Sequence, residues 1–114
     1  MTDSCPTVLF LSGDLLFASR INGAAQAAGL EFSLAGKLPE DASSVRWVIV
    51  DLATRSGVVE DLMSQCEQRC PDASVIAYGP HVQVDRLNRA REAGIPLVLT
   101  RGQFDRALSG LFTS

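Results

Sequence analysis

The stretch Trp47-Val48-Ile49-Val50-Asp51-Leu52 is the clearest strand in the sequence. Its apolar residues follow one another without alternation, which is typical of a strand buried on both faces of a parallel sheet. Val8-Leu9-Phe10-Leu11 has the same character, and shorter runs predict further strands over residues 30–34, 74–78 and 97–99. The sequence therefore predicts a five-stranded parallel sheet.

Amphipathic segments alternate with these apolar runs. Apolar residues at helical spacing predict helices over about residues 15–28, 57–69 and 82–93. Residues 36–44 are the least regular segment and have room only for a short helix that starts near Pro39. The last helix carries a single apolar stripe, which consists of Phe104, Leu108, Leu111 and Phe112.

This alternation predicts an α/β fold, with helices on both faces of the sheet in a single three-layer, doubly wound domain over residues 1–114. Right-handed crossovers leave few topologies. The simplest is the flavodoxin-like strand order 2-1-3-4-5, with a short or irregular second helix. The chain has 114 residues, of which 46% are hydrophobic, so it can bury a core without disulfides or metal ions.

Composition also bears on partners and location. The formal net charge of −3 gives no reason to expect nucleic acid or an acidic membrane as a partner. The apolar runs are too short to span a bilayer, and residues 1–6 lack the positive charge of a secretory leader. The cysteines, Cys5, Cys66 and Cys70, are odd in number, which favours a reducing compartment over a disulfide framework. We therefore expect a cytoplasmic protein.

In a doubly wound sheet, ligands bind beyond the carboxyl ends of the strands. His81, the only histidine, follows the fourth strand, but no Cys or carboxylate stands at ligand spacing from it, which favours a loop residue over a catalytic or metal-binding one. Cys66 and Cys70 share a helix face, but no second pair of ligands completes a metal site. We expect Cys66 to be a core residue and Cys70 to mark the end of the helix. The candidate crevice residues are Ser12, Gly13, Asp14, Asp51, Gly79, His81 and Arg101.

Two segments of the chain resemble the receiver domains of bacterial response regulators, the CheY-like superfamily. Residues 48–52 match the strand that ends in the family's phospho-accepting Asp. Residues 90–101 are similar to its Ala-x-x-Ala-Gly-Ala stretch, which leads into a Lys-Pro pair. The resemblance covers nearly the whole chain. It implies the same fold and a role in two-component signal transduction.

The resemblance also implies a role for each crevice position, and most of the residues differ from those of the family. Asp51 matches the phospho-accepting Asp. The acidic pair that holds Mg²⁺ falls on Ser12 and Gly13, which supply no carboxylate to a cation that prefers charged oxygen ligands. The Thr or Ser that orients the phosphoryl group falls on Gly79. The Lys that contacts the phosphoryl oxygen falls on Arg101, which keeps the charge, but its planar guanidinium is no simple replacement for an ammonium group.

Asp14 comes one residue too late to belong to the acidic pair, at a place where the family often has a third acid that binds no metal. Two further positions depart from the family pattern: the aromatic switch residue falls on Val98, and the Pro usually found four residues after the accepting Asp falls on Arg55. Phosphoryl transfer depends on positioning and on charge neutralisation by the metal, so Asp51 would be a weak nucleophile here. The resemblance therefore implies a degenerate member, a pseudo-receiver, with no metal, cofactor or enzymatic activity.

The residues alone leave the part played by Asp51 open. At the end of a strand it can cap the following loop or pair with Arg101, and we favour such a hydrogen bond or ion pair over a functional carboxylate. Arginines gather in the last third of the chain among interspersed acids, as on a solvated face. In receivers, the fourth helix, fifth strand and fifth helix form the usual face for a signalling partner or a homodimer. Here that face comprises Arg86, Arg89, Arg101, Leu111 and Phe112.

Three functions follow as hypotheses. The first is a stand-alone, non-enzymatic interaction module that acts on another signalling protein without phosphorylation. The second is an atypical response regulator phosphorylated on Asp51, against which the missing acidic pair argues. The third is a small-ligand sensor that uses the vacated crevice near Ser12, Gly79 and Arg101. Nothing in the sequence separates the first from the third, or names the partner, the pathway or the oligomeric state.

Overall fold

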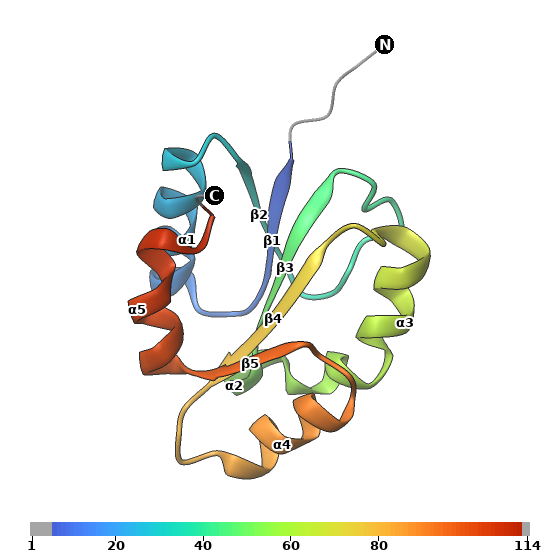
Figure 1. The fold of residues 1–114 in the computed structure, drawn as a ribbon, viewed down its shortest axis with the longest axis vertical. Helices are drawn as coiled ribbons and strands as arrows, with labels where there is room; N and C mark the ends of the chain where they lie inside the picture. The colour runs from blue at the N-terminus through green and yellow to red at the C-terminus, as the bar shows by residue number, and fades with distance from the viewer. Residues whose placement is uncertain (1–5, 113–114) are drawn as a thin grey trace.

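Five parallel strands form one sheet in the computed structural model, which describes residues 6–112 and, of Ser56, only the backbone. The strands are β1 (Thr7–Leu11), β2 (Glu31–Ala35), β3 (Val45–Asp51), β4 (Ser74–Gly79) and β5 (Leu97–Thr100). Their order across the sheet is β2-β1-β3-β4-β5, as predicted (Figure 1). The carboxyl ends of all five strands therefore meet at one edge, which we call the carboxyl edge.

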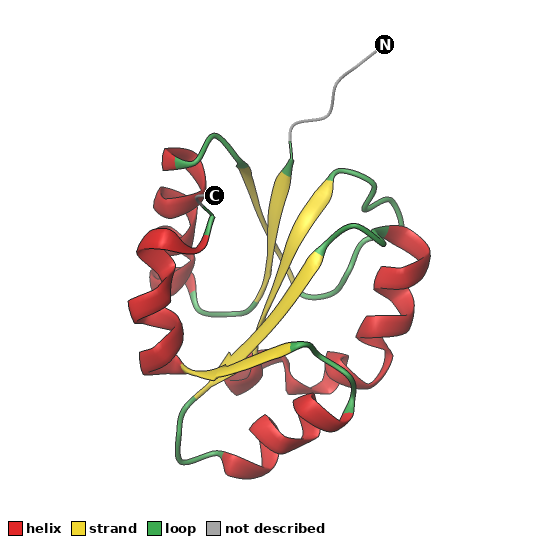
Figure 2. Cartoon of the chain, viewed as in Figure 1, coloured by secondary structure: helices red, strands yellow, loops and turns green. Residues whose placement is uncertain are grey.

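Helices cover both faces of this sheet. They are α1 (Leu15–Ala27), α2 (Leu52–Arg55), α3 (Val59–Arg69), α4 (Val84–Glu92) and α5 (Arg101–Leu111), and a 3₁₀ turn, η1 (Ser56–Val58), joins α2 to α3. Helices α1 and α5 lie on one side of the sheet, and α3 and α4 on the other (Figures 1 and 2). Within residues 6–112, no helix is long and apolar enough to span a bilayer.

The sheet separates two buried apolar clusters. Val8 and Phe10 of β1 pack in the cluster that includes α1 and α5, whereas Leu9 and Leu11 pack in the cluster of α3 and α4. All four side chains are buried. Because both faces of the strand are covered, each of its positions favours an apolar residue, and this explains the uninterrupted apolar runs in the sequence.

The predicted fold class and strand order are confirmed. The second helix of the chain is short, as expected, but it follows β3. The short helix predicted near Pro39 is wrong, because residues 36–44 form bends and turns. Arg69 of α3 donates hydrogen bonds to the carbonyls of Leu38 and Pro39, and Leu38 and Ala42 are buried. A helix over this segment would need those carbonyls for its own backbone.

The ends of several elements differ from the prediction by a few residues. Helix α4 begins at Val84 rather than at residue 82, because residues 81 and 82 form a turn after β4. Strand β3 begins two residues earlier than predicted, at Val45. Such shifts leave the residues of the carboxyl edge in place.

Candidate functional site

The carboxylate of Asp51 lies at the end of β3 and is almost fully buried, with 3% of the residue exposed. Ser12 Oγ donates to its Oδ2 at 2.8 Å, and Thr54 Oγ1 donates to the same oxygen at 2.9 Å. The backbone N–H of Ala53 donates to Oδ1 at 3.0 Å. Asp51 thus caps the short helix α2, and neutral donors satisfy its buried oxygens.

The hydroxyls of Ser12 and Thr54 connect the loop after β1 to Asp51 at the end of β3. Ser12 Oγ accepts from the backbone N–H of Asp14 at 2.8 Å, and Thr54 Oγ1 accepts from that of Gly13 at 3.0 Å. Each hydroxyl therefore donates to the carboxylate and accepts from the loop after β1. We call this set the Asp51 network: Ser12, Gly13, Asp14, Asp51, Ala53 and Thr54.

Arg101 is held next to this network by Asp14. Its Nη2 lies 3.3 Å from Asp14 Oδ2, and its guanidinium lies 5.0 Å from the centre of the Phe17 ring. The other carboxylate oxygen of Asp14 accepts from the backbone N–H of Phe17 and caps α1. Among the described residues, Arg101 pairs with Asp14 and not with Asp51, so of the two structural roles considered for Asp51, the structure has the loop cap.

Thr54 is a member of the site that is not among the predicted crevice residues. It lies three residues after Asp51, in the spacing by which a side-chain oxygen at the start of a helix meets a partner in its first turn. Asp51-Leu52-Ala53-Thr54 at a strand end was therefore a usable signal.

Gly79, at the end of β4, faces a filled space. A Cβ atom added to it would lie 3.2 Å from Leu52 Cβ, and 3.6 Å from both Leu52 Cδ1 and Leu87 Cδ2. Gly79 and Leu52 are both buried. Hydrocarbon therefore occupies the place that a side chain at position 79 would need.

Replacing Gly79 by Thr is expected to lower the free energy of unfolding by about 1–3 kcal/mol, because the new atoms press on Leu52 and bury a hydroxyl among apolar groups. Urea unfolding followed by circular dichroism measures the loss. Gly23→Ala is the control, since a Cβ atom there meets nothing within 4 Å. A Gly79→Thr protein as stable as the parent would show that the space near Leu52 is open.

Solved structures with the same arrangement of strands and helices superpose on nearly the whole chain. A response regulator receiver domain from Clostridium thermocellum matches with a TM-score of 0.71 and 18% identity, and the match covers 94% of this chain and 90% of that chain. A response regulator from Thermotoga maritima matches with a TM-score of 0.63 and 14% identity, covering 94% and 99%. The chain has the receiver fold.

A third match is the receiver domain dimer of NtrC4 in its beryllofluoride-activated form. Its TM-score is 0.64 at 19% identity, and the match covers 93% of this chain and 95% of that chain. Neither a family model nor a curated protein matches the sequence. At such low identities the receiver fold says nothing of chemistry, which has to be argued from the site.

Within the receiver fold, the structure brings some of the predicted crevice residues together and leaves others apart. Ser12, Gly13 and Asp51 share one hydrogen-bond network, and Arg101 reaches it through Asp14. His81 lies on an exposed turn after β4. The centre of the crevice is therefore a closed set of internal contacts.

Some residues of the predicted partner face are exposed, and others are half-buried in internal contacts. Arg89 and Arg101 are exposed. Arg86 is half-buried and donates to backbone carbonyls of α2. Leu111 and Phe112 are half-buried, and the Phe112 ring meets Trp47 edge-on at 5.3 Å. These two apolar residues belong mainly to the packing of α5 on the sheet.

Cys66 and Cys70 are buried free thiols at the end of α3, in the roles predicted for them. Burial raises the pKa of Cys66 from 9.0 to about 12, and the neighbouring Cys70 adds to the effect. Burial also raises the pKa of Cys70. Thiols held in the protonated form are poor nucleophiles, so we expect low reactivity from both cysteines. Cys5 lies outside the described residues.

In a Cys5→Ser background, the native protein is expected to react with a thiol reagent at pH 8 about a hundredfold more slowly than the urea-unfolded protein. Because the pKa of Cys66 is raised in the folded state, its contribution to stability is complete below pH 9 and is lost as the pH rises toward 12. Unfolding measured between pH 8 and 11 should follow this decline. Equal reaction rates in the folded and unfolded states would contradict the burial of the pair.

Tyr78 of β4 lies between aromatic rings and close to the charges of the site. Its ring stacks on Phe104 at 4.7 Å and on Phe10 at 6.2 Å. The hydroxyl is buried and has no hydrogen-bond partner among the described residues. Burial raises the pKa of Tyr78, and the charges of Asp51 and Asp14 raise it further.

Replacing Tyr78 by Phe is expected to raise the free energy of unfolding by about 1 kcal/mol, because the change removes an unsatisfied hydroxyl and keeps the aromatic stack. Thermal and urea unfolding measure the difference. Tyr78→Leu is the control and should be less stable than the parent, since it loses the stacked ring. Destabilisation by Tyr78→Phe would show that the hydroxyl has a partner.

Proposed function

We propose that this chain is a non-enzymatic signalling module with the receiver fold, which acts through protein–protein contacts and without phosphorylation. The observation that carries the proposal is the Asp51 network. Both carboxylate oxygens of Asp51 already accept hydrogen bonds from Ser12, Ala53 and Thr54. A carboxylate with 3% of its residue exposed and with these bonds is a poor nucleophile toward a phosphodonor.

The donor set around Asp51 supports the same conclusion. A hard divalent cation prefers several oxygen ligands, of which carboxylates are the strongest. Position 12 supplies a hydroxyl that is already used, and position 13 supplies no side chain. Across residues 6–112, no three His, Cys, Asp or Glu side chains are grouped so as to hold a metal ion. The nearby Asp14 is engaged by Arg101 and by the start of α1.

Gly79 adds a second, independent reason. Receiver phosphorylation, as the resemblance implies it, needs a hydroxyl after the fourth strand to orient the phosphoryl group. Here that position has no side chain, and Leu52 fills the space beside it. A phosphoryl group on Asp51 would therefore lack both a metal ion and this hydroxyl, and on Oδ2 it would displace the hydrogen bonds from Ser12 and Thr54.

The test is a ¹H–¹⁵N NMR titration of the purified protein with Mg²⁺ and then with beryllofluoride, a mimic of the phosphoryl group on Asp. The expected result is no saturable shift at Asp51, Ala53, Gly79 or Arg101. A phosphorylatable receiver domain treated in the same way is the positive control. Saturable shifts centred on Asp51 would overturn the proposal and restore a phosphorylation switch.

A second measurement addresses the contacts through which the module acts. One partner of the required kind is a second copy of the chain, which sedimentation equilibrium detects. The proposal expects the same oligomeric state with and without beryllofluoride, whether that state is a monomer or a dimer. A change of state on adding beryllofluoride would contradict independence from phosphorylation.

A further inference from the structure

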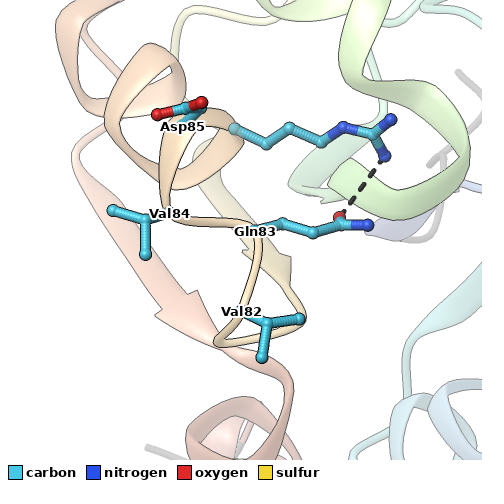
Figure 3. Close-up of a pocket in the computed structure, with 5 residues that line it drawn as sticks. Val82, Gln83, Val84 and Asp85 are labelled. Carbon is cyan, nitrogen blue, oxygen red and sulfur yellow. Dashed lines mark hydrogen bonds between the residues drawn. The ribbon is translucent and has the colours of Figure 1, made fainter.

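Arg86, in the first turn of α4, connects this helix to α2. Its Nη1 lies 3.2 Å from the carbonyl oxygens of Leu52 and Ala53. The same nitrogen lies 3.3 Å from Oε1 of Gln83, the residue that precedes α4. Figure 3 shows Gln83 with this hydrogen bond. Residues 82–86 line an open hollow of about 430 Å³.

The acceptors of Arg86 explain why the contact forms. Helix α2 has only four residues, so its carbonyls find few partners within the helix. A guanidinium supplies donors to such carbonyls, and its positive charge suits the carboxyl end of a helix. Arg86 is half-buried, which shields these bonds in part from water.

Leu52 links this contact to the end of β4. Its side chain is buried and lies against Gly79, and its carbonyl accepts from Arg86. The end of β4 and the first turn of α4 therefore both contact the same residue of α2. Leu52 directly follows Asp51, so the loop is also tied to the Asp51 network.

We propose that Arg86 is a clamp that fixes the loop between β4 and α4 onto α2, and so holds the carboxyl edge in one conformation whatever binds elsewhere on the chain. This inference deepens the proposed function and rests on it for its biological meaning: a module that needs no phosphorylation presents one constant surface. The clamp itself rests only on the contacts of Arg86 with Leu52, Ala53 and Gln83.

The same helix offers a matched control. Arg89 lies one turn after Arg86 and is exposed. The substitutions Arg86→Met and Arg89→Met remove the same charge from α4 and leave similar apolar stems. Only the first removes the hydrogen bonds to α2. Any difference between the two variants therefore reports on the clamp rather than on the net charge.

The experiment measures backbone amide exchange and ¹⁵N relaxation dispersion on both variants and the parent. In Arg86→Met, the amides of Gly79 and of residues 81–87 are expected to exchange about tenfold faster, as for the loss of one or two hydrogen bonds that hold a loop. The same variant should show microsecond-to-millisecond exchange at Gly79 and Leu52 with a common rate. Arg89→Met should behave as the parent does.

Equal behaviour of the two variants would overturn the clamp. If Arg86→Met does not fold, Arg86→Lys replaces it, because a single ammonium cannot reach the same set of acceptors and should give a smaller increase in the same residues. Parent-like exchange in Arg86→Lys would then overturn the clamp as well. The beryllofluoride titration of the parent tests the proposed function separately, so failure of one inference is distinguishable from failure of the other.

Discussion

Replacing Ser12 by Asp is expected to lower the free energy of unfolding by about 3–5 kcal/mol, the scale of an uncompensated buried charge. Ser12 Oγ lies 2.8 Å from Asp51 Oδ2, and Ser12 is 3% exposed, so the new carboxylate would be buried against an existing one. The change also removes a donor from Asp51 and an acceptor from the Asp14 N–H. Urea unfolding at neutral pH measures the loss.

The repulsion between the two carboxylates should make the stability of the Ser12→Asp protein depend on pH and on Mg²⁺. Each carboxylate raises the pKa of the other, so one proton is held more tightly in the folded state and stability should recover as the pH falls. Mg²⁺ should stabilise this variant, because two adjacent carboxylates offer a site for a divalent cation. The parent should not be stabilised by Mg²⁺. Ser12→Asn, similar in size and uncharged, is the control, and equal stability of the Asp and Asn variants would refute the argument.

Replacing Asp51 by Ala is expected to cost about 2–4 kcal/mol, because the buried donors of Ser12, Ala53 and Thr54 lose a charged acceptor. Asp51→Asn should cost about half as much, since an amide keeps one acceptor and its NH₂ group can donate to the two hydroxyls. Chemical unfolding of both variants gives the two values.

The sign of this effect separates a structural Asp51 from a functional one. A carboxylate kept among other acids for metal binding is destabilising, and its neutralisation raises stability. Within the Asp51 network the donors to the Asp51 carboxylate are neutral, and Asp14 takes part through its backbone N–H while its own carboxylate pairs with Arg101, so neutralisation of Asp51 should lower stability. A gain in stability from Asp51→Asn would therefore contradict the structural role and favour a phosphorylation site.

The fold could be predicted from the sequence because a strand that is buried on both faces consists of an uninterrupted run of apolar residues. In β1 and β3, every residue from Val8 to Leu11 and from Val48 to Val50 is buried, and each is apolar. Residues 36–44 contain no comparable pattern. Their conformation depends on Arg69, which is some thirty residues away in the chain and donates to their carbonyls. Local propensity carries no information about a contact of that kind.

The site was predictable in position but not in its contacts. Strand ends alone placed Ser12, Asp51 and Arg101 at one edge. Which carboxylate Arg101 would pair with, and that Arg86 would turn toward α2, depended on the reach of long flexible side chains among several acceptors. Hydrogen bonds of that kind are decided by the tertiary arrangement, which a pattern of residue types does not encode.

The close approach of Leu52 to Gly79 has a consequence for the natural history of this chain. A larger residue at position 79 requires a smaller one at position 52, and a smaller residue at 52 leaves a void in the core unless position 79 has grown first. Either order of substitution passes through a less stable intermediate. Positions 52 and 79 should therefore covary among descendants of this chain: a lineage with a substitution at one position should also have a substitution at the other.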